Sequence, residues 1–312
     1  MKKNLVFSLW VAFAALFGAC SDDAPAPAVN QGPLVPMTVS LDPIQTKGTG
    51  VISGESLDNG VSIGVFVVDG TGSTYDSQSY NNIKYTSSTP DARQIWSGAD
   101  ILLSATAGKA YAYYPYADGT AITAIALNVA NNDDVLYDAS GITVTNASPT
   151  ATFQLNHALS LVTVDIVRNT YTGTGSVSAF SLKAKKASAT GTLDATTGTI
   201  SGFGGYNTYI DDPLLTTPVT IPSADTKKIT RQMMIVPGGS DEAADQVTFK
   251  VVMDGQTFTA QSTEAVTFMP NKHYKFSLNM NSTGMVLSQV TVEGWTSGNG
   301  DGETLTPVIE TP

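Results

Sequence analysis

The sequence predicts an all-β protein with two β-sandwich domains in series. Short segments rich in Val, Ile, Thr, Tyr and Phe recur along its 312 residues, and clusters of Gly, Asp, Asn or Pro separate them. No stretch shows a convincing helical repeat of apolar residues. Only 14% of the residues are charged, and the mixture of Thr, Ser, Gly, Val and Ala in the middle of the chain favours half-buried strands. Many short strands at this spacing are typical of sandwich folds.

Residues 1–19 have the pattern of a secretory signal peptide. A basic start and an apolar run over residues 5–17 precede a Gly-Ala pair and then Cys20, the only cysteine. This pattern resembles the lipobox at which bacterial signal peptidase II cuts, so we expect the mature chain to begin with a diacylated Cys20. The alternative is a core cysteine beside an uncleaved anchor helix. It is disfavoured because the apolar run is shorter than the about 20 residues that a membrane span needs.

Residues 20–36 form a predicted extended tether. They contain Ala-Pro-Ala-Pro and Gly-Pro, which cannot hold a helix. The acidic pair Asp22-Asp23 resembles the export signal that sends lipoproteins of Bacteroidota to the outer face of the outer membrane, although linker charges in contact with water are an equal alternative. Met37–Leu41 then alternates apolar and polar residues and predicts one short strand. The glycine-rich segment after it holds one basic residue, Lys47, where an exposed trypsin-like protease could cut before Gly48.

From residue 61 onward the predicted strands follow quickly. A change in the alternation of apolar residues between 150 and 160 requires a bulge or the end of a strand, and we place the domain junction there. The predicted domains are 37–155 and 156–312, the second with a possible donor-strand tail. The expected strands are 61–68, 80–86, 101–104, 109–114, 122–129, 151–155, 161–167, 178–184, 191–193, 219–221, 231–236, 246–253, 256–261, 273–279 and 289–294.

Charge and cysteine content exclude some functions. The formal net charge is -11 at pH 7, which makes the chain a poor partner for nucleic acid, because phosphates need clustered Lys and Arg. A single cysteine cannot form an intrachain disulfide. Stability must therefore come from buried area, and 42% hydrophobic residues suffice for about two ordinary domains.

The sequence offers no convincing catalytic motif. Residues 60–64 match G-x-S-x-G, but that motif needs a strand that turns into a helix, and another strand is predicted after it. His157 and His273 have no metal-ligand spacing and are expected to be strand histidines with satisfied hydrogen bonds. The pairs Asp133-Asp134 and Asp211-Asp212 adjoin Asn or Pro and are expected to face solvent in turns.

Other ligand motifs are also incomplete. Residues 297–302 resemble the front half of a calcium loop, but Val308 stands where that loop requires a glutamate. There is no phosphate-binding P-loop and no dinucleotide fingerprint. We therefore expect no enzyme activity, no cofactor and no metal site.

A series of short motifs resembles the fimbrillin family of Bacteroidota type V pili. No single motif is specific, but together they follow the family order behind a lipobox and cover nearly the whole mature chain. Asn271-Lys272 departs from the pattern, because the family commonly has glycine before this lysine. The motifs are VSIGVF at 61–66, YNNIKY at 80–85, IW at 95–96, YAYYPY at 111–116, DVLY at 134–137, FQLNHALS at 153–160, GTLD at 191–194, IVP at 235–237 and VEGW at 292–295.

The resemblance implies a fold and a mode of assembly. Proteins of this family resemble two tandem transthyretin-like β-sandwiches that reach the surface as lipoproteins, and a protease then removes the first strand together with the lipid. The open groove accepts a strand from another chain. By this resemblance Met37–Leu41 is the strand removed, Lys47 and Gly48 flank the cut, and Glu303–Glu310 is the donor. The alternatives are an ordinary loop lysine and a frayed tail.

We therefore expect a structural subunit of a cell-surface pilus, located at the outer membrane and in the fimbrium. Its partners would be other pilin subunits, a trypsin-like surface protease and outer-membrane lipid through the acylated cysteine. Alternatives are a pilus anchor or tip adhesin, or a surface glycan-binding lipoprotein. Tyr111, Tyr113, Tyr114 and Tyr116 are candidates for a sugar-stacking platform, although core packing suits their spacing equally well.

Overall fold

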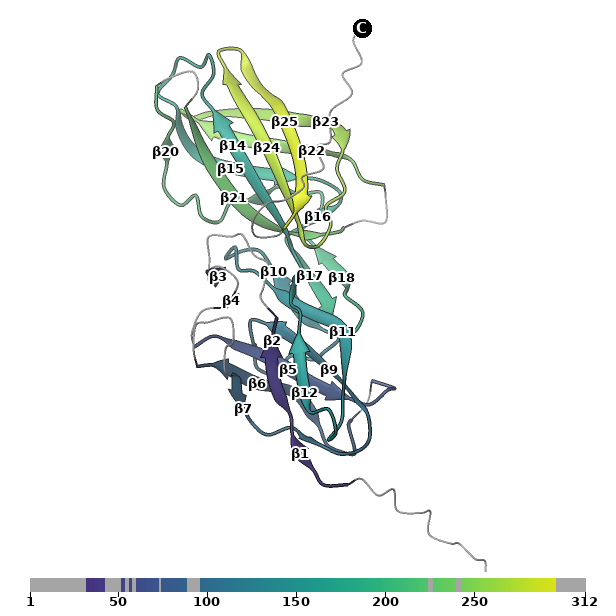
Figure 1. Cartoon of the computed structure of the whole chain (residues 1–312). Coiled ribbons are helices and arrows are strands. Elements are labelled where there is room, and N and C mark those ends of the chain that lie inside the picture. Colours follow the sequence, from purple (N-terminus) through teal and green to yellow (C-terminus); the bar gives the residue numbers. More distant parts are fainter. Residues whose placement is uncertain are drawn as a thin grey trace, which may run out of the picture.

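Strands are the only regular elements in the part of the chain that the computed structural model describes. That part comprises residues 32–42, 52–53, 56–57, 60–72, 74–88, 96–223, 227–239 and 243–295. Within these ranges, no helix is long and apolar enough to cross a membrane. The all-β class predicted from the sequence is confirmed (Figure 1).

The N-terminal half contains one large sheet and several short strand pairs. The order of the large sheet is β13-β11-β9-β5-β6-β7. Its members are β5 (Ser62–Val68), β6 (Tyr80–Ser87), β7 (Trp96–Gly98), β9 (Gly108–Tyr114), β11 (Leu136–Val144) and β13 (Asn156–His157). The short pairs are β1 (Val35–Pro36) with β8 (Leu102–Leu103), β2 (Thr38–Leu41) with β12 (Thr150–Phe153), and β3 (Ile52–Ser53) with β4 (Ser56–Leu57).

The C-terminal half contains two facing sheets. The first has the order β16-β21-β14-β24-β25, with β14 and β24 parallel, and the second has the order β19-β15-β22-β23, with β20 also paired to β15. The strands are β14 (Ser160–Val167), β15 (Ser176–Lys183), β16 (Ala187–Ser188), β19 (Ile210–Asp211), β20 (Val219–Thr220), β21 (Lys228–Pro237), β22 (Gln246–Met253), β23 (Gln256–Ala265), β24 (Lys272–Asn281) and β25 (Gly284–Gly294).

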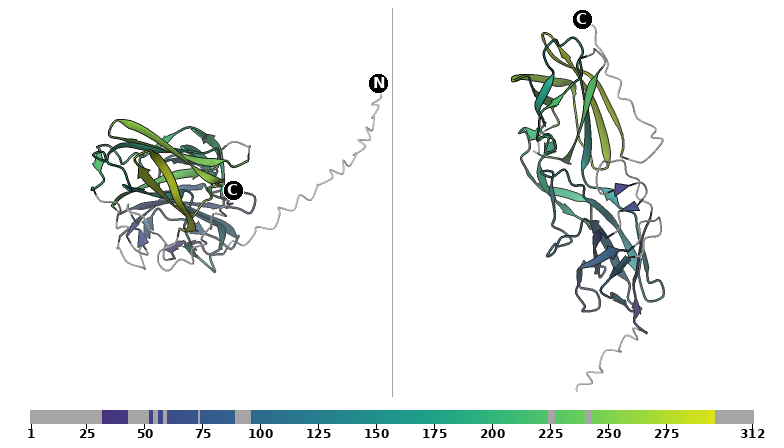
Figure 2. Two further views of the ribbon diagram at one scale, coloured as in Figure 1. Left: turned by 90° about the horizontal axis from the view of Figure 1, so that it is seen from above. Right: turned by 90° about the vertical axis from the view of Figure 1, so that its left-hand side faces the viewer.

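A small sheet links the two halves. Strand β10 (Ile125–Asn128) pairs with β17 (Thr190–Asp194), which pairs in turn with β18 (Thr199–Gly204). Figures 1 and 2 show the halves end to end, with this sheet at their junction. Because a strand from before residue 155 pairs with one after it, the sheets do not divide cleanly at that position. The domain boundary at 155/156 stays a prediction.

Two hydrophobic cores support the halves. One core belongs to the N-terminal half and includes Met37, Val39, Trp96 and Phe153. The other fills the space between the two C-terminal sheets and also takes in residues from β5, β9 and β10. The strands of both halves thus bury apolar faces, which agrees with the low share of charged residues in the sequence.

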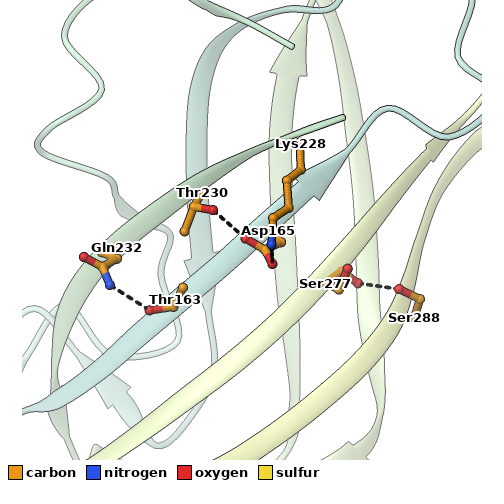
Figure 3. A network of polar contacts seen from close by, with 7 residues as sticks. All are labelled: Thr163, Asp165, Lys228, Thr230, Gln232, Ser277 and Ser288. Carbon is orange, nitrogen blue, oxygen red and sulfur yellow. Dashed lines mark hydrogen bonds and ion pairs between the residues drawn. The ribbon is translucent and has the colours of Figure 1, made fainter. Parts of the chain in front are cut away.

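The outer face of the first C-terminal sheet is polar. Val162, Val164 and Ile166 point inward from β14, whereas Thr163 and Asp165 point outward. On that outer face the side chains pair across strands, as Figure 3 shows. The contacts are Lys228 Nζ to Asp165 Oδ2 at 2.5 Å, Thr230 Oγ1 to Asp165 Oδ1 at 2.6 Å, Gln232 Nε2 to Thr163 Oγ1 at 3.2 Å and Ser288 Oγ to the Ser277 carbonyl at 3.2 Å.

Most strands expected from the sequence are present, some with shifted ends. The strand expected at 246–253 coincides with β22, and the phase change near residue 155 falls between the end of β12 and the start of β14. Strand β11 was not among the strands expected from the sequence, although it lies inside the large sheet. A register shift between Asp138 and Ile142 interrupts its pairing, and Gly141 has a φ of 63° there, so the bulge has the composition of a turn.

The turn before β24 accommodates an asparagine where the resemblance leads us to expect a glycine. Asn271 has a φ of 58°, in the left-handed region that glycine adopts freely and asparagine tolerates. We expect Asn271→Gly to change the free energy of unfolding by less than about 0.5 kcal/mol and Asn271→Val to lower it by about 1–2 kcal/mol. Urea denaturation of both variants measures this, and equal effects would contradict it.

Candidate functional site

The first strand segment of the described chain lies between two other strands. Residues Val35 and Pro36 pair antiparallel with β8, and Thr38–Leu41 pairs parallel with β12. Three further backbone hydrogen bonds extend this pairing: Met37 N to Ile101 O at 2.8 Å, Thr38 N to Pro149 O at 2.8 Å and Asp42 N to Phe153 O at 2.9 Å. The strand predicted at Met37–Leu41 is present and begins one residue later, at Thr38. Figure 1 shows β1 and β2 running beside β12.

Alternation along this segment places its apolar side chains in the core. Met37 is 6% exposed and Val39 is 5% exposed, whereas Thr38 faces solvent. Both apolar side chains belong to the N-terminal core that also contains Phe153 and Leu103. Full burial of one such side chain contributes about 1.5–3 kcal/mol. The segment is thus held by its two apolar side chains and by backbone hydrogen bonds on both edges.

The neighbours of this segment depend on it for their pairing. Strands β1 and β8 form a sheet of only two strands, and so do β2 and β12. Without residues 35–41, backbone groups of Leu103 in β8 and of Thr150–Phe153 in β12 would lose their partners, whereas those of Leu102 keep the Tyr80 hydroxyl. The space that holds Met37 and Val39 would open. Such a slot has the two features that recruit an added strand, which are free backbone groups and apolar pockets. We call these residues of β8 and β12 the acceptor groove.

A cavity of about 640 Å³ lies where this first segment ends, at the junction of the halves. Its lining comes from the residue after β2, the bulge of β11, the segment from β12 to β13, and the turn before β24. The lining is mostly polar and consists of Asp42, Tyr137, Asp138, Ala139, Ser140, Thr152, Gln154, Asn156, His157, Pro270 and Asn271. The acceptor groove therefore leads toward the C-terminal half.

Several residues singled out from the sequence lie outside the described residues. These are Cys20, Lys47, Gly48, the glycine-rich segment 297–302 and the tail Glu303–Glu310. Their roles in lipidation, cleavage and strand donation stay predictions. The described chain ends at Trp295, just after β25.

His157 lies between Asp134 and Trp295 in a buried cluster at the junction of the two halves. Its Nδ1 lies 2.5 Å from Asp134 Oδ2, and its ring stacks on Trp295 with centroids 3.6 Å apart and planes 4° apart. The side chain of Asp134 is only 10% exposed, so the expectation that it faces solvent is wrong. The carboxylate is buried because His157, which lies on a different strand, pairs with it. This contact joins the end of the described chain to the N-terminal half.

The second aspartate expected to face solvent is also buried. Asp212 is 6% exposed and accepts a hydrogen bond from Arg231 Nε at 2.6 Å. A buried carboxylate needs such a charged partner, and here β21 supplies it. Asp211, by contrast, is exposed as expected. The pair could not be predicted from local sequence, because Asp212 follows β19 in one sheet and Arg231 lies in β21 of the other.

The remaining candidates for chemistry have structural partners. Ser62 of the G-x-S-x-G match begins strand β5, and its Oγ lies 2.9 Å from Thr86 Oγ1 across the sheet. His273 Nε2 lies 2.7 Å from Thr163 Oγ1, and its Nδ1 lies 3.4 Å from Glu293 Oε1. Within the described ranges, no three His, Cys, Asp or Glu side chains converge as a metal site would require.

The tyrosines near residue 113 do not form an exposed platform. Tyr113 and Tyr114 are 1% and 7% exposed, and both belong to hydrophobic cores. The Tyr113 hydroxyl donates to the Ala117 carbonyl at 3.0 Å and also contacts Asn82 Oδ1 at 3.0 Å. Tyr111 and Tyr116 are half-buried. Core packing therefore holds for Tyr113 and Tyr114.

Tyr85, in the same core as Met37, gives a pH-dependent prediction. Burial, with contributions from Asp100 and Tyr80, raises its pKa from 10.0 to about 12. The folded state therefore keeps a proton that the unfolded state releases, so this stabilisation is complete below about pH 10 and is lost as the pH rises toward 12. When the pH rises from 9 to 11, the free energy of unfolding should fall by about 1 kcal/mol more for the unchanged chain than for Tyr85→Phe, as measured by urea denaturation. Identical losses would contradict the prediction.

Comparison with known proteins gives a consistent result. The sequence matches the model of a family described as fimbrillin-like over residues 49–295. The crystal structure of a protein assigned to cell adhesion from Bacteroides uniformis is similar to this chain, with 18% sequence identity and a TM-score of 0.58. The comparison covers 84% of this chain and 99% of that chain. A second such protein, from Bacteroides ovatus, has 17% identity and a TM-score of 0.59, with 86% and 100% covered. The TM-scores show that this chain shares the fold of these two proteins. No curated protein matches the sequence.

Proposed function

The chain belongs to the fimbrillin-like family, and from this membership we propose that it is a structural subunit of a cell-surface pilus. It reaches the outer membrane as a lipoprotein acylated at Cys20. A trypsin-like protease cuts between Lys47 and Gly48, and the subunit then assembles with other pilins by strand exchange. The proposal includes no catalytic role and no cofactor.

The observation that carries this proposal is the placement of β1 and β2. They fill the acceptor groove with Met37 and Val39, and they lie before Lys47 in the chain. A cut after Lys47 leaves this segment held only by non-covalent contacts. The family match supports the same division, because it begins at residue 49 and excludes the segment. Departure of residues 20–47 would expose the groove to a strand from a second copy.

Controlled proteolysis tests the coupling between cleavage and assembly. The chain from residue 20 onward, with Cys20→Ser to avoid lipid, is treated briefly with trypsin and separated by size. We expect oligomers that start at Gly48 and lack the segment 20–47. Lys47→Gln should stay monomeric and uncut at this position, whereas the control Lys109→Gln, at an exposed cross-strand contact with Thr143, should behave like the unchanged chain. Assembly of the uncut Lys47→Gln variant would contradict the proposal.

Lipid attachment has a separate test. In the producing cell, the unchanged chain should incorporate labelled palmitate and fractionate with the outer membrane. Cys20→Ser should lose both properties while the fold after residue 32 stays intact. Labelling of the Cys20→Ser chain would exclude Cys20 as the acylated residue.

A further inference from the structure

Two lysines flank one tyrosine ring on the outer face of the second C-terminal sheet. Lys250 Nζ lies 4.3 Å from the ring centroid of Tyr209, and Lys183 Nζ lies 5.3 Å from it. Lys183 ends β15, Lys250 is in the middle of β22, and Tyr209 directly precedes β19. Each ammonium group gains a cation–π contact there. Neither forms an ion pair with another residue that the structure describes.

The strand register brings polar side chains beside these lysines. Thr248 lies opposite Lys183 on one side and Gln261 on the other, and Thr259 lies opposite Lys250. The intervening residues of β22 point into the core, so this row faces outward. Gln261 Nε2 donates to Thr248 Oγ1 at 2.9 Å, which fixes the orientation of the amide.

A cavity of about 310 Å³ lies beside this row, and Lys250 is not part of its lining but contacts the ring of Tyr209, which is. Its lining is Lys183, Tyr209, Thr248, Thr259, Ala260 and Gln261. Ligand pockets commonly begin at about 300 Å³, so the cavity is large enough for a single sugar residue. With a formal net charge of -11 for the chain, two neighbouring ammonium groups without a carboxylate partner among the described residues make this a locally positive site.

From this arrangement we propose that the cavity binds an anionic saccharide, a sugar that carries a carboxylate or a sulfate. The ammonium group of Lys183 in the lining and that of Lys250 beside Tyr209 attract the anion. The threonine hydroxyls, the glutamine amide and the tyrosine hydroxyl match the hydroxyl groups of the sugar. This activity is independent of strand exchange, because the site is remote in sequence from β1 and β2 and shares no residue with the acceptor groove.

A peptide suits the site less well. Strand β22 is paired with β15 on one edge and β23 on the other, so a peptide strand could add only at the outer edge of β23, on the side away from the two lysines. The lining contains one small apolar side chain, Ala260, and no apolar pocket. Peptides that bind sheets use a free edge and side-chain pockets. Recognition here must come from polar side chains alone.

The test measures binding to the chain from residue 20 onward with Cys20→Ser, by calorimetry at low salt. The probes are 3′-sialyllactose, a heparin-derived tetrasaccharide, neutral lactose and a synthetic peptide of residues 296–312, which has three acidic residues and no basic ones. We expect one or both anionic sugars to bind and lactose not to bind. Binding of 3′-sialyllactose shows that a carboxylate suffices, whereas binding of the heparin fragment alone, which carries carboxylates and sulfates, points to the sulfates.

Matched variants locate the binding site. Lys183→Gln or Lys250→Gln should weaken anionic sugar binding about 3- to 5-fold, the loss of one surface ion pair, and the double variant about 10-fold. Lys228→Gln is the control, because this exposed lysine pairs with Asp165 on the other sheet. The proposal is overturned if neither anionic sugar binds, if lactose binds equally well, if only the peptide binds, or if Lys228→Gln weakens binding as much as the double variant does.

Discussion

Replacement of both Met37 and Val39 with serine is expected to lower the free energy of unfolding of the N-terminal half by about 4 kcal/mol. Both side chains are buried in its core, so the substitutions remove apolar contacts and place hydroxyl groups among Phe153, Leu103 and their neighbours. After a cut at Lys47, the same change should let the segment 20–47 leave the groove more easily.

Urea denaturation followed by tryptophan fluorescence measures the first effect, in a Trp295→Phe background in which Trp96, a member of the same core, is the one tryptophan after residue 20. The control is Thr38→Ala, at a solvent-facing position of the same strand, with an expected change below about 0.5 kcal/mol. Size separation after trypsin treatment then compares how much of the segment stays bound. If the serine variant and the control are equally stable, the segment does not depend on its apolar side chains.

The second large effect is expected at the junction of the halves. Trp295→Ala should lower the free energy of unfolding by about 3–5 kcal/mol, because the indole is 1% exposed and stacks on His157. The substitution also removes the contact through which the end of the described chain holds the buried pair of His157 and Asp134.

The matched variant is Trp295→Phe, which keeps an aromatic ring and should lose about half as much stability. Urea denaturation followed by circular dichroism compares the two, since Trp295 itself is no longer available as a fluorescent probe. A Trp295→Ala chain as stable as the Trp295→Phe chain would show that stacking on His157 contributes little.

The sequence predicted the strands better than it predicted their partners. Alternation and turn residues located β22 and the segment at Met37–Leu41, because both signals are local. The parallel pairing of that segment with β12 joins residues far apart in the sequence, and no local pattern encodes it. Strand β11 was missed because its bulge at Asp138–Ile142 has the composition of a turn.

The candidate sites depended even more on distant contacts. Asp212 looked like a solvent-facing turn residue until the fold placed Arg231 beside it. The lysines around Tyr209 come from separate strands, so their spacing in the sequence carries no sign of a common site. The resemblance to fimbrillins, in contrast, was readable from short motifs, and the match to the family over residues 49–295 confirmed it.

We propose that cleavage after Lys47 converts a lipid-anchored monomer into an assembling subunit. This proposal can be tested by determining the N-terminus and intact mass of the protein taken from the surface of the producing cell. We expect a chain that begins at Gly48, carries no lipid and is found in assemblies of high mass. An acylated chain that begins at Cys20, found as the only form, would contradict it.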